Sequence, residues 1–89
     1  MRALETTKRF DKDLQREVGS DPSVATQVRD VIQLLLDDQR LPAARRDHKL
    51  KGGWKDHRDC HVRPDLVLIY AKPKGVLRLV RLGSHSELF

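Results

Sequence analysis

Most side chains that could transfer protons lie in the second half of this 89-residue chain, which contains all four histidines. The densest stretch, residues 54–62, contains His57, Asp59 and His61. If its second part is extended, the two-residue period of a strand places these three side chains on one face and Cys60 on the other. Two imidazoles and one carboxylate then line a single surface.

Three more titratable residues are predicted to lie where strands end or loops begin. Asp65 follows a proline at a predicted turn, His48 lies in a basic loop, and His85 follows the glycine that ends the last predicted strand. We expect all three to converge on one end of the sheet. An isolated histidine is usually a solvated surface residue, but four in one basic half favour a shared site.

A histidine-rich cluster either binds a metal ion or transfers protons. Zinc sites usually show ligands in short sequence pairs. Here the neighbours His57, Cys60 and His61 alternate between opposite faces of the predicted strand, and the other two histidines are distant in the sequence. Metal binding therefore ranks third, behind acid–base catalysis and simple surface polarity.

Acid–base catalysis fits these residue types best. Imidazole titrates near neutral pH, so two imidazoles at one site can donate one proton and accept another, which suits transfer at a phosphodiester. Arg81, near the end of the last predicted strand, is placed to stabilise the extra negative charge of a pentavalent phosphate. RNA supplies its own nucleophile, the 2′-hydroxyl. The residues therefore predict a ribonuclease that needs no metal or other cofactor.

A small sheet is predicted to position these residues. Residues 66–71 form a continuous apolar run of strand length, residues 72–75 predict a turn, and residues 76–82 form a second β-rich run. Together they predict a hairpin. Residues 54–62 predict one further strand, and residues 2–6 predict a short strand at the N-terminus.

Two helices are predicted between the first strand and the others. The first begins at Thr7 as N-cap, ends at Gly19, and has an apolar face formed by Phe10, Leu14 and Val18. The second follows Asp21-Pro22 and stops at Leu41-Pro42, and its apolar residues at helical spacing are Val24, Val28, Val31, Ile32 and Leu35. The predicted fold class is α+β, an N-terminal strand and a helical hairpin packed on a small, mainly antiparallel sheet whose other face stays open.

Charge is distributed unevenly along the chain. Residues 1–43 contain seven Lys and Arg and eight Asp and Glu, whereas residues 44–89 contain 11 and five. A basic surface attracts phosphate backbones, so nucleic acid or an acidic protein is the expected partner. Lysines and arginines that only increase solubility are the alternative explanation.

Length and composition limit the class of protein further. A chain of 89 residues fits a single domain spanning residues 1–89. Its one cysteine cannot form an internal disulfide, which favours a reducing compartment. The N-terminus lacks the apolar run of a signal peptide, and no stretch is long enough to span a bilayer. We expect a soluble cytoplasmic protein without a membrane partner.

Two segments resemble a known family: His48-Lys-Leu-Lys-Gly-Gly-Trp-Lys-Asp-His-Arg-Asp-Cys-His-Val-Arg-Pro-Asp-Leu-Val-Leu-Ile-Tyr70 and Arg81-Leu-Gly-Ser-His-Ser-Glu-Leu-Phe89. Together they are similar to the YafQ branch of the RelE/ParE toxin superfamily, over nearly the whole chain and most strongly in its second half. The resemblance implies a compact RelE-like toxin that cleaves messenger RNA on the ribosome. It also implies a cognate antitoxin protein, with the toxin monomeric within the toxin–antitoxin complex.

The resemblance also implies which residues act. The family's catalytic residues fall on His48, His61, Asp65, Arg81 and His85. The first three would bind and activate the nucleophile, His85 would protonate the leaving 5′-oxygen, and Arg81 would stabilise the phosphorane. Which group is the general base stays open, because coupled histidines share their titration. Phe89 matches the terminal aromatic of the family and would hold an RNA base or the His85 segment.

Other positions are assigned binding or packing. Lys49, Lys51 and Lys55 are predicted to bind phosphates of ribosomal RNA or of the message. Leu66 stands where YafQ-type chains can carry Trp, and His57 stands in place of an aromatic, which affects substrate preference more than the reaction. Residues predicted to be buried or packed are Trp54, Cys60 and Tyr70.

Two other functions compete with the nuclease. One is a ParE-like toxin that binds DNA gyrase and cleaves nothing, and the other is a basic RNA-binding module without catalysis. A pure binder has no need for the set His48, His61, Asp65 and His85. An RNA-binding module needs exposed aromatic rings for stacking, and this chain has few.

Overall fold

A mixed five-stranded sheet organises the chain, and the structure, a computed structural model, describes all of residues 1–89. The strands are β1 (Ala3–Thr6), β2 (His48–Lys49), β3 (Arg58–Arg63), β4 (Leu66–Ala71) and β5 (Val76–Gly83). The helices are α1 (Lys8–Ser20), α2 (Val24–Leu36) and α3 (His85–Leu88), with 3₁₀ turns η1 (Ala43–Arg45) and η2 (Gly52–Trp54). The strand order is β1-β5-β4-β3-β2, and only the β1–β5 pair is parallel. The predicted α+β fold is confirmed.

The two long helices form as their sequence predicts, with small shifts at their ends. The Thr7 hydroxyl accepts a hydrogen bond from the Phe10 N–H at 3.0 Å and so caps α1. Gly19 does not end this helix, which continues through Ser20. The second helix begins only at Val24, because the residues before it form a turn held by the Asp21 side chain.

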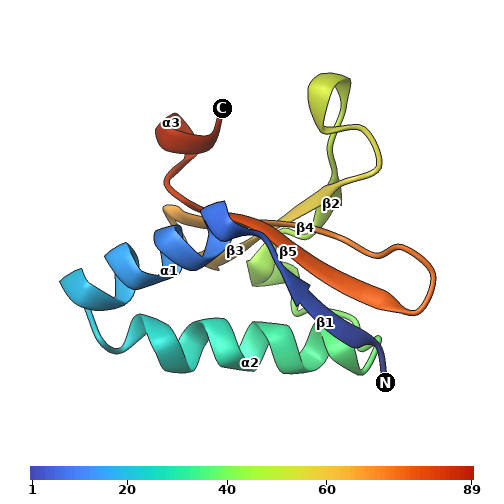
Figure 1. Ribbon diagram of the computed structural model, residues 1–89, viewed down its shortest axis with the longest axis horizontal. Helices are drawn as coiled ribbons and strands as arrows, with labels where there is room; N and C mark the ends of the chain where they lie inside the picture. The colour runs from blue at the N-terminus through green and yellow to red at the C-terminus, as the bar shows by residue number, and fades with distance from the viewer.

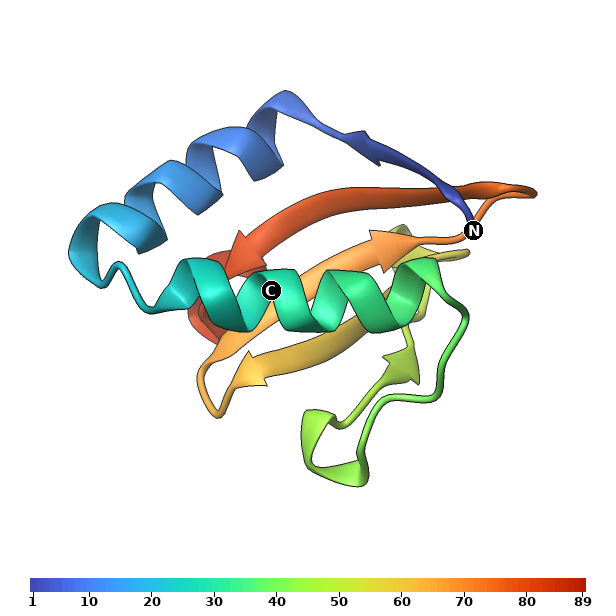
Figure 2. The same ribbon diagram turned by 90° about the horizontal axis from the view of Figure 1, so that it is seen from below.

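Helices α1 and α2 cover one face of the sheet, as Figures 1 and 2 show from two directions. Their apolar residues pack with inward-facing strand residues into one core. Burying each large apolar side chain contributes about 1.5–3 kcal/mol. Cys60 and Tyr70 are both fully buried in this core, as predicted. The Tyr70 hydroxyl donates a hydrogen bond to the Asp47 carboxylate.

The other face of the sheet is not open along its whole length, so that prediction is partly wrong. Every residue of β4 is buried. On the face away from α1 and α2, Val67 and Ile69 are covered by Leu88 of α3. Trp54 packs against the same cluster, which confirms its packing role. In Figure 1, α3 and the segment around η2 both rise on this side of the sheet.

The region between α2 and β3 differs most from the prediction. The expected strand over residues 54–62 begins only at Arg58, because the tight η2 turn precedes it. Gly52 and Asp56 have φ values of 64° and 67°, in the left-handed region. A strand cannot continue through either residue, so Trp54 lies outside the strand. Strand β2, η1 and α3 are too short to leave a periodic pattern and were not predicted. None of the helices has the length and apolar character needed to cross a membrane.

Candidate active site

Strand register places most of the predicted catalytic residues on the face away from α1 and α2. His48 lies opposite Asp59, Asp59 opposite Ile69, and Ile69 opposite Arg81. Residues directly opposite each other in antiparallel strands share a face, so this row crosses four strands. A second row joins His61 to the strand end just before His85 through Val67 and Gly83. The register therefore gathers side chains that are far apart in the sequence.

A β-bulge puts Arg81 on this face. Tyr70 lies opposite Leu79, but Ile69 lies opposite Arg81, so Val80 is an extra residue in β5. If the pairing instead continued regularly from Leu79, Val80 would lie opposite Ile69 and Arg81 opposite Leu68, whose side chain belongs to the helix-facing core. The bulge therefore turns the guanidinium out of the core, an arrangement that bulges near functional sites often produce.

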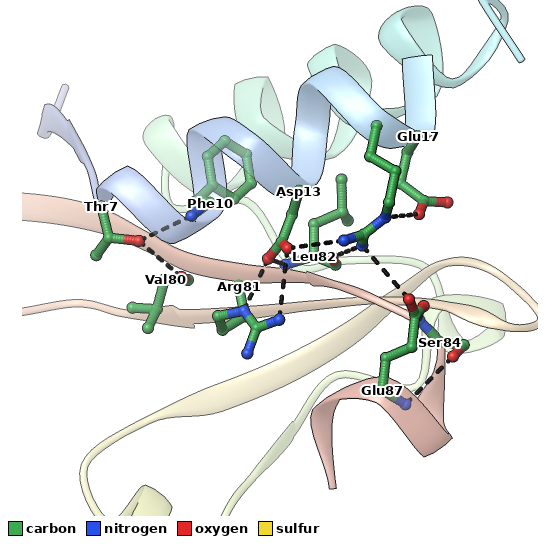
Figure 3. A network of polar contacts seen from close by, with 10 residues as sticks. Thr7, Phe10, Asp13, Glu17, Val80, Arg81, Leu82, Ser84 and Glu87 are labelled. Atoms are coloured by element: carbon green, nitrogen blue, oxygen red, sulfur yellow. Dashed lines mark hydrogen bonds and ion pairs between the residues drawn. The ribbon is translucent and has the colours of Figure 1, made fainter. Parts of the chain in front are cut away.

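Asp13 of α1 holds the arginine and the bulged strand together (Figure 3). Arg81 Nε donates to Asp13 Oδ2 at 2.8 Å, and the Leu82 N–H donates to the same oxygen at 3.0 Å. Asp13 is 4% exposed. Burial alone would raise its pKa, but the Arg81 and Leu82 hydrogen bonds outweigh burial and hold the pKa below its usual value. Sequence reasoning missed this residue, because a single Asp in an amphipathic helix carries no distinguishing pattern.

Two of the predicted catalytic histidines are held with a defined tautomer. His48 Nδ1 lies 2.9 Å from the Arg46 carbonyl oxygen, and His61 Nδ1 lies 3.1 Å from the Pro64 carbonyl oxygen. A carbonyl oxygen only accepts, so Nδ1 carries the proton in both rings. In the neutral ring Nε2 is then the basic atom. Both side chains are therefore oriented to accept a proton at Nε2.

Asp59 lies beneath the histidines and is 1% exposed. Its Oδ1 has no hydrogen-bond donor, and His48 Nδ1, whose proton points to the Arg46 carbonyl oxygen, lies 3.1 Å away. Burial raises the pKa of Asp59, and the charges of His48, His61 and His85 act in the opposite direction. The predicted face shared by Asp59 and His61 is correct, but Asp59 is a buried partner of the histidines and not a surface group.

The C-terminal segment brings His85 to the same place. Ser84 and Glu87 form a capping box, in which the Glu87 carboxylate accepts the Ser84 N–H at 2.8 Å and the Ser84 hydroxyl accepts the Glu87 N–H at 3.3 Å. The His85 N–H points to the Asp65 carboxylate at 3.4 Å. The ring of His85 lies 6.1 Å from that of His61. The predicted convergence is confirmed for Asp65 and His85, whereas His48 lies on β2 opposite Asp59.

Aromatic rings continue from the histidines toward η2. The Phe89 ring lies 5.0 Å from that of His85 and 6.5 Å from that of Trp54, which in turn lies 5.4 Å from that of His57. Phe89 is 51% exposed. Its position beside His85 agrees with the predicted role in holding that segment or a base. The three predicted phosphate-binding lysines, Lys49, Lys51 and Lys55, are exposed on β2 and around η2.

No group of three or more His, Cys, Asp or Glu side chains has a geometry that could hold a metal ion. Cys60 in particular lies in the helix-facing core, and burial raises the pKa of its thiol to about 12. It therefore contributes neither a ligand nor a nucleophile to the site face.

Comparison with known proteins assigns the chain to a family. Residues 2–89 match the family model described as the bacterial toxin of type II toxin–antitoxin systems, YafQ. The chain belongs to the YafQ toxin family. A curated relative, the mRNA interferase toxin YafQ of Escherichia coli strain B / BL21-DE3, is 35% identical over 89 residues, which cover 99% of this chain and 96% of the relative.

Solved structures of toxins superimpose along the whole chain. The metal-bound toxin from Helicobacter pylori is 47% identical, with a TM-score of 0.93 and complete coverage of both chains. The E. coli DinJ–YafQ complex contains a chain that is 36% identical, with a TM-score of 0.84 and coverage of 100% of this chain and 99% of that one. The predicted fold is therefore the fold of solved YafQ toxins.

Proposed function

We propose that this YafQ-family toxin is an endoribonuclease that cleaves messenger RNA on the ribosome by acid–base catalysis. The observation that carries the proposal is the pairing of His61 with His85, whose rings lie 6.1 Å apart on one face of the sheet. Two imidazoles at that separation can serve the two sides of one phosphodiester. The name of the E. coli relative, mRNA interferase toxin, supports the same activity.

The proposed reaction uses the 2′-hydroxyl of the RNA as nucleophile. His48 or His61 takes the hydroxyl proton at Nε2, because carbonyl oxygens hold the Nδ1 proton of both rings. The 2′-oxygen bonds to phosphorus, and the bond to the 5′-oxygen breaks. His85 gives a proton to that leaving oxygen, which yields a 2′,3′-cyclic phosphate and a 5′-hydroxyl. Asp65 holds the His85 backbone.

Arg81 is proposed to stabilise the phosphorane. Its Nε and Nη2 point to Asp13, which leaves its Nη1 without a protein partner. A guanidinium restrained in this way stabilises developing negative charge without reorganising during the reaction. Asp59 beside His48 is proposed to stabilise the cationic form of that imidazole after proton transfer.

The proposed partners follow from the site and the family. A protein of only 89 residues offers little surface to orient a flexible RNA strand. The ribosome is therefore proposed to present the RNA to the toxin. An antitoxin protein is the proposed neutralising partner, since the E. coli YafQ toxin is found with DinJ. The toxin is proposed to be monomeric within that complex, and, once released, to act in the cytoplasm, where ribosomes are.

The test is inducible expression followed by primer extension on a translated message. We expect discrete cuts inside open reading frames, which disappear with His61→Ala and with His85→Ala while antitoxin affinity stays within about twofold. Undiminished cutting by both variants would refute the acid–base mechanism. Intact message with altered DNA supercoiling would instead favour a gyrase-binding toxin.

A further inference from the structure

A hollow of about 390 Å³ lies at the outer edge of β3, directly beside His61. Its walls are Gln27 of α2, residues 44–46 of the η1 segment, and residues 61–64. Three arginines line it, and none of its lining residues is acidic. None of the predicted phosphate-binding lysines belongs to it. The hollow is therefore a cationic feature that the catalytic proposal does not use.

The hollow exists because β2 is so short. Strand β2 pairs with β3 only at Asp59 and Arg58, so the remaining outer edge of β3 has no strand neighbour. The η1 segment lies against this edge, and Arg45 Nη1 donates to the Val62 carbonyl oxygen. The Arg45 side chain thus takes the place of a neighbouring strand as hydrogen-bond donor to β3. The hollow is the space left between η1 and α2.

Two of the three arginines keep an uncompensated charge. Arg63 is neutralised by Asp21 at 2.8 Å, and its other guanidinium nitrogens donate to Ser23 and Gln27. Arg45 instead donates to a neutral carbonyl oxygen, and neither Arg45 nor Arg46 forms an ion pair. Guanidinium groups without a carboxylate partner are suited to bind phosphate oxygens.

Two residues link the hollow to the histidine cluster. His61 is one of its lining residues, and the His61 ring lies 6.1 Å from that of His85. Arg46 also lines it, and the Arg46 carbonyl oxygen holds His48 Nδ1. Arg46 has a φ of 52°, a left-handed conformation that a non-glycine residue adopts at some energetic cost. That conformation presents its carbonyl to His48.

We infer that this hollow binds the phosphodiester next to the one that is cleaved, with Arg45 and Arg46 as its two ligands. The inference deepens the proposed function and rests on it. A strand whose scissile phosphate lies between His61 and His85 passes His61, and its next phosphate then meets the Arg45 and Arg46 guanidinium groups, which have no carboxylate partner. Because His61 belongs both to the hollow and to the proposed cleavage site, the proposed occupant is an RNA phosphate and not a carboxylate of an acidic antitoxin segment.

A phosphate-by-phosphate scan tests this subsite. The probe is a fluorescent RNA strand centred on a mapped cut site, with 2′-deoxyribose at the cut to prevent cleavage. Each phosphodiester is replaced in turn by a neutral methylphosphonate, and the affinity of the full-length toxin is measured by fluorescence anisotropy. With wild-type toxin we expect a loss of about 5–10-fold at one position adjacent to the cut, as for one lost charged contact.

The arginine variants decide whether that position belongs to the hollow. In Arg45→Gln/Arg46→Gln the same methylphosphonate should cost nothing, while every other position keeps its wild-type penalty. The charge-matched control is Arg9→Gln/Arg29→Gln, which removes two exposed helix arginines and should leave the whole profile unchanged. Because Arg45 also supports β3, Arg46→Gln alone is measured as well and should reduce the penalty at that position.

Two results would overturn the subsite. One is an identical profile for wild-type toxin and the arginine variants. The other is a loss of antitoxin affinity in these variants with RNA binding unchanged, which would assign the hollow to an acidic peptide. The scan measures binding alone, so it stands apart from the cleavage assay. Cutting with a flat profile would refute only the subsite, and failure to cut would refute the proposed function.

Discussion

The Arg81 side chain is held on the site face by Asp13, a residue 68 positions earlier in the chain. One carboxylate oxygen accepts from the Arg81 guanidinium at 2.8 Å and from the Leu82 N–H at 3.0 Å. The same α1 surface contributes Thr7, whose hydroxyl donates to the Val80 carbonyl oxygen at 2.7 Å. Side chains of α1 therefore continue the edge pairing of β5 after β1 has ended, across the bulge that turns Arg81 outward.

We expect Asp13→Asn to lower the rate of message cleavage about 10-fold. The amide keeps one oxygen for the Leu82 N–H but loses the charge that restrains Arg81, and a hydrogen bond to a charged group contributes about 1.5–3 kcal/mol. The measurement is the single-turnover cutting rate on translating ribosomes, together with the free energy of unfolding.

Two further variants separate positioning from general destabilisation. Thr7→Val removes the α1 cap and the bond to Val80 without touching Arg81, so it should cost stability but keep the cutting rate. In a chain already carrying Arg81→Ala, Asp13→Asn should lower the rate no further. Multiplicative losses in the double variant would show that Asp13 acts only through stability.

Asp59→Asn is expected to stabilise the fold while it lowers activity. Burial raises the pKa of Asp59 above its ordinary value of 3.8, so the folded state binds that proton more tightly than the unfolded chain. The protonated Asp59 side chain therefore favours the folded state at low pH, and this stabilisation is lost as pH rises through the raised pKa of the folded state. At pH 7 the variant should therefore be more stable than the wild-type toxin, with a higher Tm.

The pH dependence supplies the control for this variant. The gain should shrink as pH falls toward 3.8, where the wild-type carboxyl becomes neutral in both states. Cleavage should fall at pH values where the wild-type carboxylate is ionised, because His48 loses its charged neighbour there. A variant less stable than wild type at pH 7 would mean that the ion pair with His48 outweighs the cost of burial.

The parts of the fold that sequence predicts are those with a long periodic pattern. Helix α2 has five apolar residues at helical spacing, and β4 is a continuous apolar run, so both follow from side-chain burial alone. The gathering of histidines in the basic half follows from composition. The identity of the site face follows from strand alternation around Asp59 and His61.

The remaining features depend on contacts that no local pattern reports. The bulge at Val80 adds one residue within an otherwise regular strand, and only pairing with β4 shows that Arg81 faces outward. The partner that holds Arg81, Asp13, is equally unmarked in the sequence. Helix α3 has four residues and forms because a capping box and Leu88 hold it on the sheet. It covers apolar strand residues that alternation alone would leave open.

Cys60 should be unreactive in the folded toxin. Burial raises the pKa of its thiol to about 12, and the thiolate is the reactive form, so at pH 8 only about one thiol in 10⁴ is ionised. We expect a disulfide-exchange reagent to label the unfolded chain within minutes and the native toxin only at its rate of unfolding. Labelling of native toxin as fast as unfolded chain would place Cys60 outside the core.

Ser84→Ala tests whether His85 must be held in place. Loss of a capping hydroxyl costs about 0.5–2 kcal/mol, which for a four-residue terminal helix is enough to fray α3 and release His85. We expect cutting to fall about 10-fold or more with little change in global Tm, because the main core lies on the opposite face of the sheet. Faster amide exchange of the Phe89 N–H, which donates to the His85 carbonyl oxygen, would report the fraying. Ser20→Ala, at an exposed serine at the end of α1, is the control and should leave cutting unchanged. If α3 frays while cutting persists, His85 does not act from its capped position, and the acid in the reaction is another group.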